Sequence, residues 1–180
     1  MFRAKYLDYT ELTTQLQTWA TAHPDFVHLS GLGKSRDGRD IPLLTLGPKP
    51  EEMRPAVWVN ANMHASEFCG SSAALAIAED VIALHAGTPI GHTLPAHMAE
   101  MVKNVLFYIV PRLSPDGAEA VLKTGRYVRS HTADNRADKG RTYWQNADVD
   151  GDGQMGYMRQ QCAEGEMVEL VDEHGARVAP

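Results

Sequence analysis

Two residues that can bind a metal ion, His64 and Glu67, lie three apart in the segment Val57-Trp-Val-Asn-Ala-Asn-Met-His-Ala-Ser-Glu-Phe. Zinc accepts imidazole nitrogen and carboxylate oxygen, and a catalytic zinc keeps one coordination position open for water. An apolar, β-prone run ends just before the pair, and open α/β sheets bind their ligands where strands end. A hydrogen-bonded structural pair is the alternative. The same spacing recurs at His97 and Glu100 without a preceding strand, so the context favours His64 and Glu67 as candidate zinc ligands.

Two arginines, Arg126 and Arg129, stand three apart in Gly-Arg-Tyr-Val-Arg-Ser. Arginine presents a planar fork of donors that can hold a carboxylate or stabilise a developing oxyanion. A solvated basic turn is the simpler interpretation of the same residues. Upstream, Pro111-Arg-Leu-Ser-Pro-Asp-Gly predicts a tight turn, because Asp and Gly suit the backbone angles that turns require. Taken alone, both segments are open to a structural or a functional interpretation.

A third polar group, Asp148, Asp150 and Asp152, occupies positions one, three and five of a Gly-rich loop, with Gly153 at position six. This arrangement matches the start of a calcium-binding loop. Position twelve, which carries a bidentate Glu in an EF-hand, is Arg159, so an EF-hand is excluded. Two interpretations are left, a calcium site of another kind or an acidic turn without an ion.

Size and charge restrict the class of protein. The chain has 180 residues, 43% of them hydrophobic, which predicts one domain over residues 1–180 with a single core. Its net charge of −6 argues against nucleic acid or an anionic membrane as the main partner. The N-terminus lacks a signal-peptide pattern, and no apolar stretch approaches the about 20 residues that span a bilayer. We therefore expect a soluble, cytoplasmic protein, and the sequence indicates no oligomeric state.

Hydrophobic periodicity predicts the elements of the N-terminal part. A capping-box pattern, Asp8-Tyr-Thr-Glu, precedes a helix that His23-Pro24 ends. Strands predicted over 26–33 and 41–46 flank an Asp-Gly hairpin turn. Pro42 suggests that the second of these strands lies at an edge of the sheet. A helix followed by a hairpin is therefore expected.

A strand–helix–strand unit follows the hairpin. Strands are predicted over 56–60 and 105–110, around a helix over 68–86 that is apolar over most of its surface and expected to be mostly buried. The run at 105–110 is apolar on both faces, which indicates a central place in a covered sheet. The order predicts an α/β fold with a mixed, largely parallel sheet flanked by helices. Polar, Gly-rich sequence over 131–180 predicts an insertion that carries the Asp-rich loop.

The order of these motifs resembles that of the carboxypeptidase A-like family of zinc carboxypeptidases. In that family a strand leads into His-x-x-Glu, a later strand leads into Pro-x-x-Asn-Pro-Asp-Gly, and an Arg-x-x-Arg segment follows. This chain carries the three motifs in the same order. Its segment Gly33-Lys-Ser-Arg-Asp-Gly-Arg is also similar to the family's Gly-x-Ser-x-(Glu/Asp)-Gly-Arg hairpin. The resemblance covers residues 5–130.

The resemblance implies roles for individual residues. His64 and Glu67 would bind zinc together with a third, histidine ligand. Arg126 would stabilise the oxyanion of the reaction, and Arg129 would contact the substrate nearby. Asp116 would support the turn beside the site.

The chain departs from the family pattern at several positions. Ser114 stands for the usual Asn, and Ala65 and Ser66 stand where an arginine is common inside His-x-x-Glu. The family's third ligand, general-base glutamate and carboxylate-binding Asn-Arg pair have no clear counterpart after residue 130. His131 and His174 are the candidates for a ligand within this chain. Family domains are longer, so the chain corresponds to the N-terminal portion of such a catalytic domain.

The resemblance implies a zinc metallocarboxypeptidase that hydrolyses C-terminal residues from peptide substrates. Zinc is the expected cofactor, joined by calcium if the Asp-rich loop binds an ion. One alternative is an acylamino-acid deacylase on the same fold, which hydrolysis of N-acyl amino acids would reveal. Another is a non-catalytic calcium-binding or interaction module without the C-terminal catalytic half. That module would show calcium-dependent binding and no hydrolysis.

Overall fold

The computed structural model describes residues 2–125, 127–130, 151–153, 170–171 and 177–178. The chain divides into two compact units, residues 1–137 and 138–180. In the second unit, β5 (Leu170–Val171) pairs antiparallel with β6 (Arg177–Val178). A single domain over residues 1–180 with an insertion over 131–180 stays a prediction.

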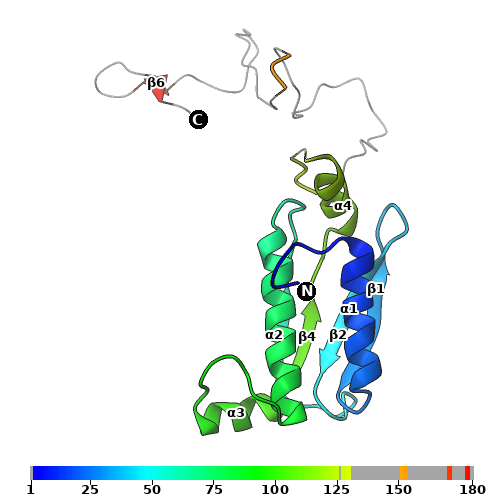
Figure 1. Cartoon of the computed structure of the whole chain (residues 1–180), viewed down its shortest axis with the longest axis vertical. Helices are drawn as coiled ribbons and strands as arrows, with labels where there is room; N and C mark the ends of the chain where they lie inside the picture. Colours follow the sequence, from blue (N-terminus) through cyan, green and yellow to red (C-terminus); the bar gives the residue numbers. More distant parts are fainter. Residues whose placement is uncertain (1, 126, 131–150, 154–169, 172–176, 179–180) are drawn as a thin grey trace. The chain divides into compact units, whose positions relative to one another are not determined.

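The described part of the first unit alternates helices and strands along the chain (Figure 1). In order, the elements are α1 (Tyr9–Ala22), β1 (Val27–Lys34), β2 (Asp40–Leu46), β3 (Ala56–Asn60), α2 (Phe68–Ala86), α3 (Ala96–Lys103), β4 (Leu106–Val110) and α4 (Pro115–Thr124).

The four strands form one mixed sheet in the order β1-β2-β4-β3. The β3–α2–β4 unit makes β3 and β4 parallel, with Asn60 opposite Val110, as a helical crossover requires. The other two pairings, β1 with β2 and β2 with β4, are antiparallel. The mixed sheet flanked by helices is confirmed. Within the described residues, however, the sheet is less parallel than predicted, because the second strand of the hairpin runs against β4.

The hairpin turns at the predicted Asp-Gly pair, where Gly38 has a φ of 85° and donates its N–H to the Ser35 carbonyl at 3.0 Å. The prediction that β2 is an edge strand was wrong for the strand as a whole. Pro42 faces Gly31 of β1, and pairing with β4 begins only at Leu44. Pro42 therefore lies where β2 has a neighbour on one side, which a residue without an N–H tolerates.

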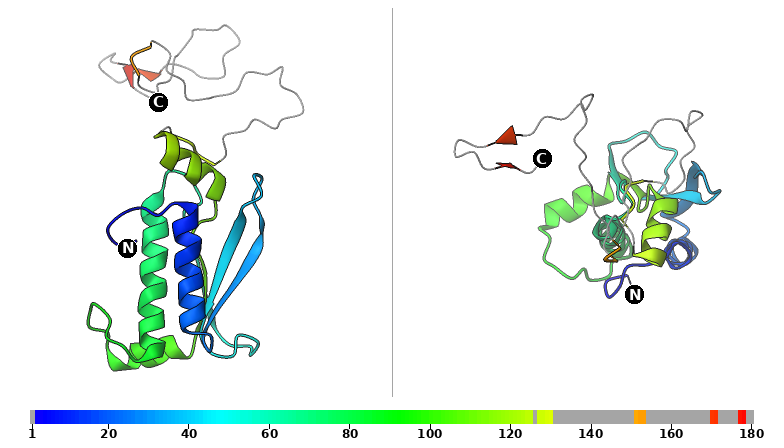
Figure 2. Two further views of the ribbon diagram at one scale, coloured as in Figure 1. Left: turned by 45° about the vertical axis from the view of Figure 1, so that its right-hand side comes forward. Right: turned by 90° about the horizontal axis from the view of Figure 1, so that it is seen from above.

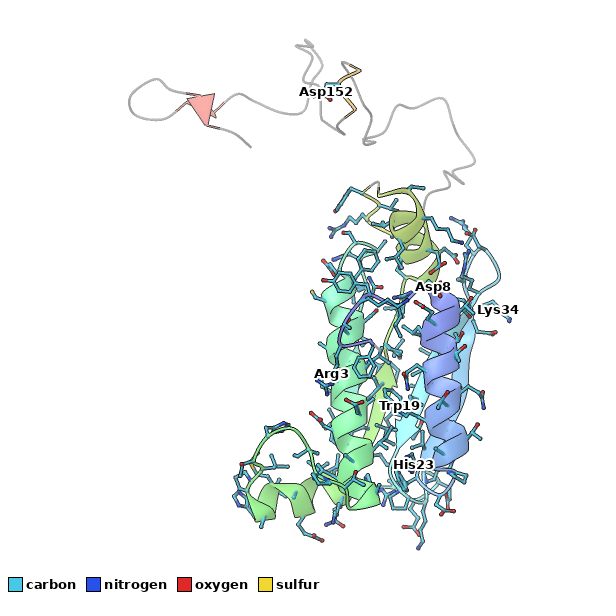
Figure 3. The ribbon with its side chains drawn as sticks, viewed as in Figure 1. Arg3, Asp8, Trp19, His23, Lys34 and Asp152 are labelled. Atoms are coloured by element: carbon cyan, nitrogen blue, oxygen red, sulfur yellow. The ribbon has the colours of Figure 1, made fainter. Side chains whose placement is uncertain are left out.

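Helices α1 and α2 cover the same face of the sheet (Figure 1 and Figure 2). The capping box that starts α1 is present in full: Glu11 donates its N–H to Asp8 at 2.8 Å, and Asp8 donates its N–H to Glu11 at 3.2 Å. Trp19 extends from α1 toward α2 (Figure 3) and meets Phe2 edge to face at 5.8 Å. The core beneath both helices consists mainly of Leu12, Leu16, Val27, Leu44, Leu46, Ala74, Leu75, Ala78, Ile82 and Ile109. Burial of each large apolar side chain in this core stabilises the fold by roughly 1.5–3 kcal/mol relative to leaving it exposed.

The opposite face of the sheet is open in the part of the chain that the structure describes. Trp58 of β3 is 54% exposed, and its ring lies 6.3 Å from that of Tyr108 in β4. The prediction of a sheet covered on both faces is therefore not met by the described residues, because both long helices lie on the other side.

Helix α2 has the predicted bounds but not the predicted burial. Its buried side chains, among them Leu75, Ala78 and Ile82, face the core, whereas Ile77 is 40% exposed. The helix is also long and apolar enough to meet the length and composition test for a membrane span, so the expectation that no stretch would do so was wrong. A helix packed on a sheet core meets the same test, and the result is weak evidence for a membrane.

Candidate metal centre

The two loops at the carboxyl ends of β3 and β4 are tied together by backbone hydrogen bonds. Ala61 donates its N–H to Val110 at 2.9 Å, which extends the parallel pairing by one residue. Leu113 then donates to the Ala61 carbonyl at 3.0 Å. The His-x-x-Glu turn and the segment 111–117 therefore lie side by side at the strand ends, where α/β folds place their ligands.

The two candidate zinc ligands face each other in this turn. His64 Nδ1 and Glu67 Oε1 are 2.8 Å apart, and the side chains are 32% and 54% exposed. Two ligand atoms on one tetrahedral zinc ion lie about 3.3 Å apart. A small widening of the contact would thus let one ion bind both atoms from solvent, so the pair fits the zinc that the motif implies.

The carboxylate of Glu67 is held in its charged form. The hydrogen bond with His64 lowers its pKa, and the positive charge of Arg129 adds to this effect. Arg129 lies at the turn because its carbonyl accepts the Ala65 N–H at 2.6 Å. A charged carboxylate is the form that binds metal. Arg129 is therefore beside the candidate ligands, as the motif order predicted, although its role toward a substrate stays a prediction.

Asp116 supports the site by holding the β1–β2 hairpin, as predicted for a structural residue. Its carboxylate accepts hydrogen bonds from the Ser35 hydroxyl at 2.8 Å, the Asp37 N–H at 3.0 Å and Arg39 Nη1 at 2.7 Å. Burial alone would raise the pKa of Asp116, but these donors outweigh it and lower the pKa. Asp116 and Gly117 belong to the first turn of α4 and not to the tight turn predicted for this segment. The Gly-x-Ser-x-Asp-Gly-Arg hairpin and the start of α4 are thus two halves of one hydrogen-bonded cluster.

Gly117 is the point where three segments meet. A Cβ atom there would lie 2.1 Å from the Ser130 carbonyl oxygen and 2.6 Å from Ala65 Cβ. Ser114 donates its hydroxyl to the same Ser130 carbonyl at 2.8 Å. The absence of a side chain at Gly117 therefore lets the segment with Arg129 approach the His-x-x-Glu turn.

Sequence reasoning missed a buried arginine at the base of this region. Arg112 is 1% exposed and donates to the Leu7 carbonyl at 2.7 Å. Its Nη1 lies 3.7 Å from Glu119, which also accepts the Tyr9 N–H at 2.6 Å. Burial lowers the pKa of Arg112. A charged residue two positions after an apolar strand was the available signal. Arg112 connects the N-terminal segment to α4.

Several predicted residues lie outside the described part of the chain: Arg126, Asp148, Asp150, His131 and His174. Asp152 is described, between Gly151 and Gly153 with φ angles of 80° and 84°. Among the described residues no group of three or more His, Cys, Asp and Glu side chains could hold a metal ion. The described centre therefore consists of two ligands.

A mixed α/β sheet with a His-x-x-Glu pair at its parallel strand ends defines a class, that of α/β zinc hydrolase domains. The chain belongs to the zinc carboxypeptidase family, whose sequence model matches residues 12–165. This agrees with the order of motifs along the chain.

Individual relatives in sequence are also zinc carboxypeptidases or inactive members of that group. The chain is 32% identical over 124 residues to a zinc carboxypeptidase of Saccharothrix mutabilis subsp. capreolus, covering 68% of this chain and 27% of the relative. It is 26% identical to an inactive metallocarboxypeptidase of Ajellomyces dermatitidis over 153 residues, covering 83% of this chain and 24% of the relative. The chain thus spans about a quarter of the length of these curated relatives.

Solved structures support the fold. Thrombin-activatable fibrinolysis inhibitor is similar with a TM-score of 0.64 and 20% identity, over 75% of this chain and 32% of that one. Carboxypeptidase A from Helicoverpa armigera is similar with a TM-score of 0.62 and 23% identity, over 73% and 30%. At this identity the likeness concerns the fold alone.

Proposed function

We propose that this chain contributes two ligands to the zinc centre of a metallocarboxypeptidase, which hydrolyses C-terminal residues from peptides. The observation that carries the proposal is the 2.8 Å approach of His64 Nδ1 to Glu67 Oε1 at the end of β3, in a chain of this family. When bound, zinc would supply Lewis-acid polarisation of the scissile carbonyl and a water of lowered pKa.

The chain's own residues would then act around that ion. His64 and Glu67 would hold it, and the exposed side of the pair leaves room for a substrate. Arg126 would stabilise the oxyanion through its planar donors, and Arg129 would bind an anionic group of the peptide. The backbone bond between Arg129 and Ala65 supports this assignment, because it holds the arginine segment beside the turn.

The Asp-rich loop is a separate part of the proposal. Asp148, Asp150 and Asp152 would bind calcium through carboxylate oxygens, and the positive φ angles of Gly151 and Gly153 suit the sharp turns of such a loop. A bound calcium ion would stabilise the second unit by mass action. We further propose that neither nucleic acid nor an anionic membrane is the main partner, on the basis of the net charge of −6.

A non-catalytic module is the second candidate function. It is favoured by the similarity to an inactive metallocarboxypeptidase and by the presence of only two ligands in the described centre. An acylamino-acid deacylase would use the same zinc pair on a smaller amide substrate. The substrate tests below separate these alternatives.

The decisive experiment is zinc stoichiometry on the purified chain, with His64→Ala and the matched variant His97→Ala. Both histidines begin a His-x-x-Glu motif, but His97 lies on the exposed helix α3. We expect zinc binding in the wild type and in His97→Ala, and none in His64→Ala. Equal zinc content in His64→Ala and the wild type would rule out the assignment.

Activity is tested with a peptide that has a free C-terminus, the same peptide with an amidated C-terminus, and an N-acyl amino acid. Zinc-dependent hydrolysis of the free peptide alone supports the carboxypeptidase. Hydrolysis of the N-acyl amino acid alone supports the deacylase. Stoichiometric zinc without hydrolysis of any of them supports the non-catalytic module.

A further inference from the structure

Asn62 lies at the base of the turn that carries the two candidate ligands. The residue is 2% exposed, and its φ of 52° lies in the left-handed region, which Asn and Gly enter more readily than other residues. A buried amide must have its donors and acceptor paired, because an unpaired polar group costs about 1–3 kcal/mol. The partners of the Asn62 side chain therefore decide its function.

The amide of Asn62 faces the peptide groups between the ligands. Its Nδ2 donates to the His64 carbonyl at 2.7 Å and to the Ala65 carbonyl at 3.2 Å. Its Oδ1 accepts the hydroxyl of Ser71 at 3.2 Å. Carbonyl oxygens only accept hydrogen bonds, so the orientation that turns Nδ2 toward them is the one that pairs both carbonyls.

Asn62 is itself hydrogen-bonded to two other segments of the chain, α2 and the loop after β4. Ser71, in the first turn of α2, shares its single hydroxyl proton between Asn62 Oδ1 and the nearer Pro111 carbonyl at 2.7 Å, and its oxygen accepts from Arg112 Nε at 3.4 Å. The main-chain carbonyl of Asn62 accepts the Ser114 N–H at 3.1 Å. The turn is thus connected through Asn62 to α2, where Ser71 is buried, and to the loop after β4.

We propose that Asn62 is a positioning residue for the metal centre, which directs His64 and Glu67 toward one point before an ion binds. The Asn62 side-chain NH2 group binds the successive carbonyls of His64 and Ala65, and so fixes the planes of the peptide groups between the two ligands. Residues that orient ligands in this way raise metal affinity by lowering the cost of organising the site. The inference rests on the proposed zinc function and adds a residue that the His-x-x-Glu motif does not contain.

Two variants separate the amide from the backbone shape. Asn62→Asp keeps the size of the side chain but replaces the two donors by an oxygen that faces two carbonyls. Asn62→Gly keeps the left-handed backbone and removes the amide. Asn104→Asp is the matched control, because Asn104 is exposed after α3.

The first measurement is zinc affinity by competition with a chromophoric chelator. We expect Asn62→Asp to weaken binding by about tenfold or more and Asn62→Gly by a smaller factor, with Asn104→Asp unchanged. The added negative charge of Asn62→Asp would by itself attract zinc, so a loss of affinity reports displaced ligands. Wild-type affinity in both Asn62 variants would overturn the proposal.

The second measurement uses the metal-free chain and backbone NMR. We expect the signals of residues 63–67 to shift in Asn62→Asp and Asn62→Gly, while those of β2 and β4 stay in place. Unmoved signals at 63–67 in a folded Asn62→Gly would overturn the proposal. If the wild-type chain takes up no zinc, the proposed metal centre fails for this chain, and the NMR comparison alone decides the role of Asn62. An unfolded Asn62→Asp leaves the decision to Asn62→Gly.

Discussion

The chain contains two His-x-x-Glu motifs, and the structure places them in different surroundings. His64 and Glu67 follow β3 in a turn whose backbone is anchored by the buried Asn62. His97 and Glu100 lie on α3, an eight-residue helix without a buried residue. α3 precedes β4, so it lies at the other end of the parallel strand pair from the turn with His64 and Glu67.

The two motifs differ in how their backbone is held. Both motifs supply the same chemical groups at the same spacing. In the first motif, buried Asn62 of the same loop binds the His64 and Ala65 carbonyls and is itself bonded to Ser71 of α2. In the second, the Glu100 carbonyl accepts from Asn104, an exposed residue at the end of α3 itself. Substitutions beside the His64–Glu67 turn should therefore have larger effects than matched substitutions at exposed positions.

The largest expected effect is on zinc binding by Glu67→Gln. The substitution keeps the shape of the side chain but removes the charge that binds the ion. We expect an affinity loss of roughly 100-fold or more, because residues that only support a ligand already contribute 10–100-fold. Isothermal titration of Glu67→Gln and of Glu100→Gln measures the difference. Equal losses in the two variants would contradict the distinction between the motifs.

Asp116→Ala should cause the next largest effect, on stability. It leaves Ser35, the Asp37 N–H and Arg39 without their common acceptor, and we expect a loss of about 3 kcal/mol in the free energy of unfolding. Asp40→Ala removes a surface ion pair with Lys34 and should cost less than about 1 kcal/mol. Urea denaturation of both variants tests this order.

The pH dependence of the same cluster has a definite sign. The pKa of Asp116 is lowered from its ordinary 3.8. Its stabilisation is therefore complete above that value and is lost as the pH falls through the lowered pKa. Acid denaturation should begin at similar pH in the wild type and Asp40→Ala. In Asp116→Ala, the free energy of unfolding should lack the part that falls as Asp116 is protonated.

Gly117→Ala should cost about 1–3 kcal/mol, because the new methyl group meets the Ser130 carbonyl and Ala65. Gly91→Ala is the control, since a Cβ there meets nothing within 4 Å. We expect the control to change stability by less than about 1 kcal/mol. Thermal unfolding compares the two, and NMR signals of 127–130 should shift only in Gly117→Ala. Unshifted signals would mean that the arginine segment does not depend on Gly117.

The smallest expected effect belongs to His85 at the end of α2. Burial lowers its pKa, assisted by the charges of Lys103 and Arg54, and its Nε2 has no hydrogen-bond partner. A lowered pKa means that protonation opposes folding, so stability rises as the pH increases through the range below 6.5. The slope of unfolding free energy against pH should be smaller in His85→Leu than in the exposed variant His92→Leu.

Local patterns predicted the elements well where each residue's neighbours in sequence decide its structure. The capping box at Asp8 and the bounds of α2 are confirmed, since both follow from periodicity and end signals. The covered faces of the sheet and the burial of α2 were predicted from composition and were wrong for the described residues. Burial depends on what packs against a surface, and an apolar strand such as Ala56–Asn60 does not contain that information.

The sequence by itself determined the family, the candidate ligands His64 and Glu67 and the strand that precedes them, because these depend on residue types in a fixed order. The tertiary structure decided which side chains form hydrogen bonds with the segments around His64 and Glu67. Asp116 meets the hairpin across 81 residues of chain from Ser35, and Ser71 meets Pro111 across 40. The first contact depends on the antiparallel pairing that places the hairpin beside β4, and the second on the parallel pairing of β3 and β4. The candidate ligands could therefore be predicted from residue types and motif order, whereas the hydrogen bonds around them exist only in the folded chain.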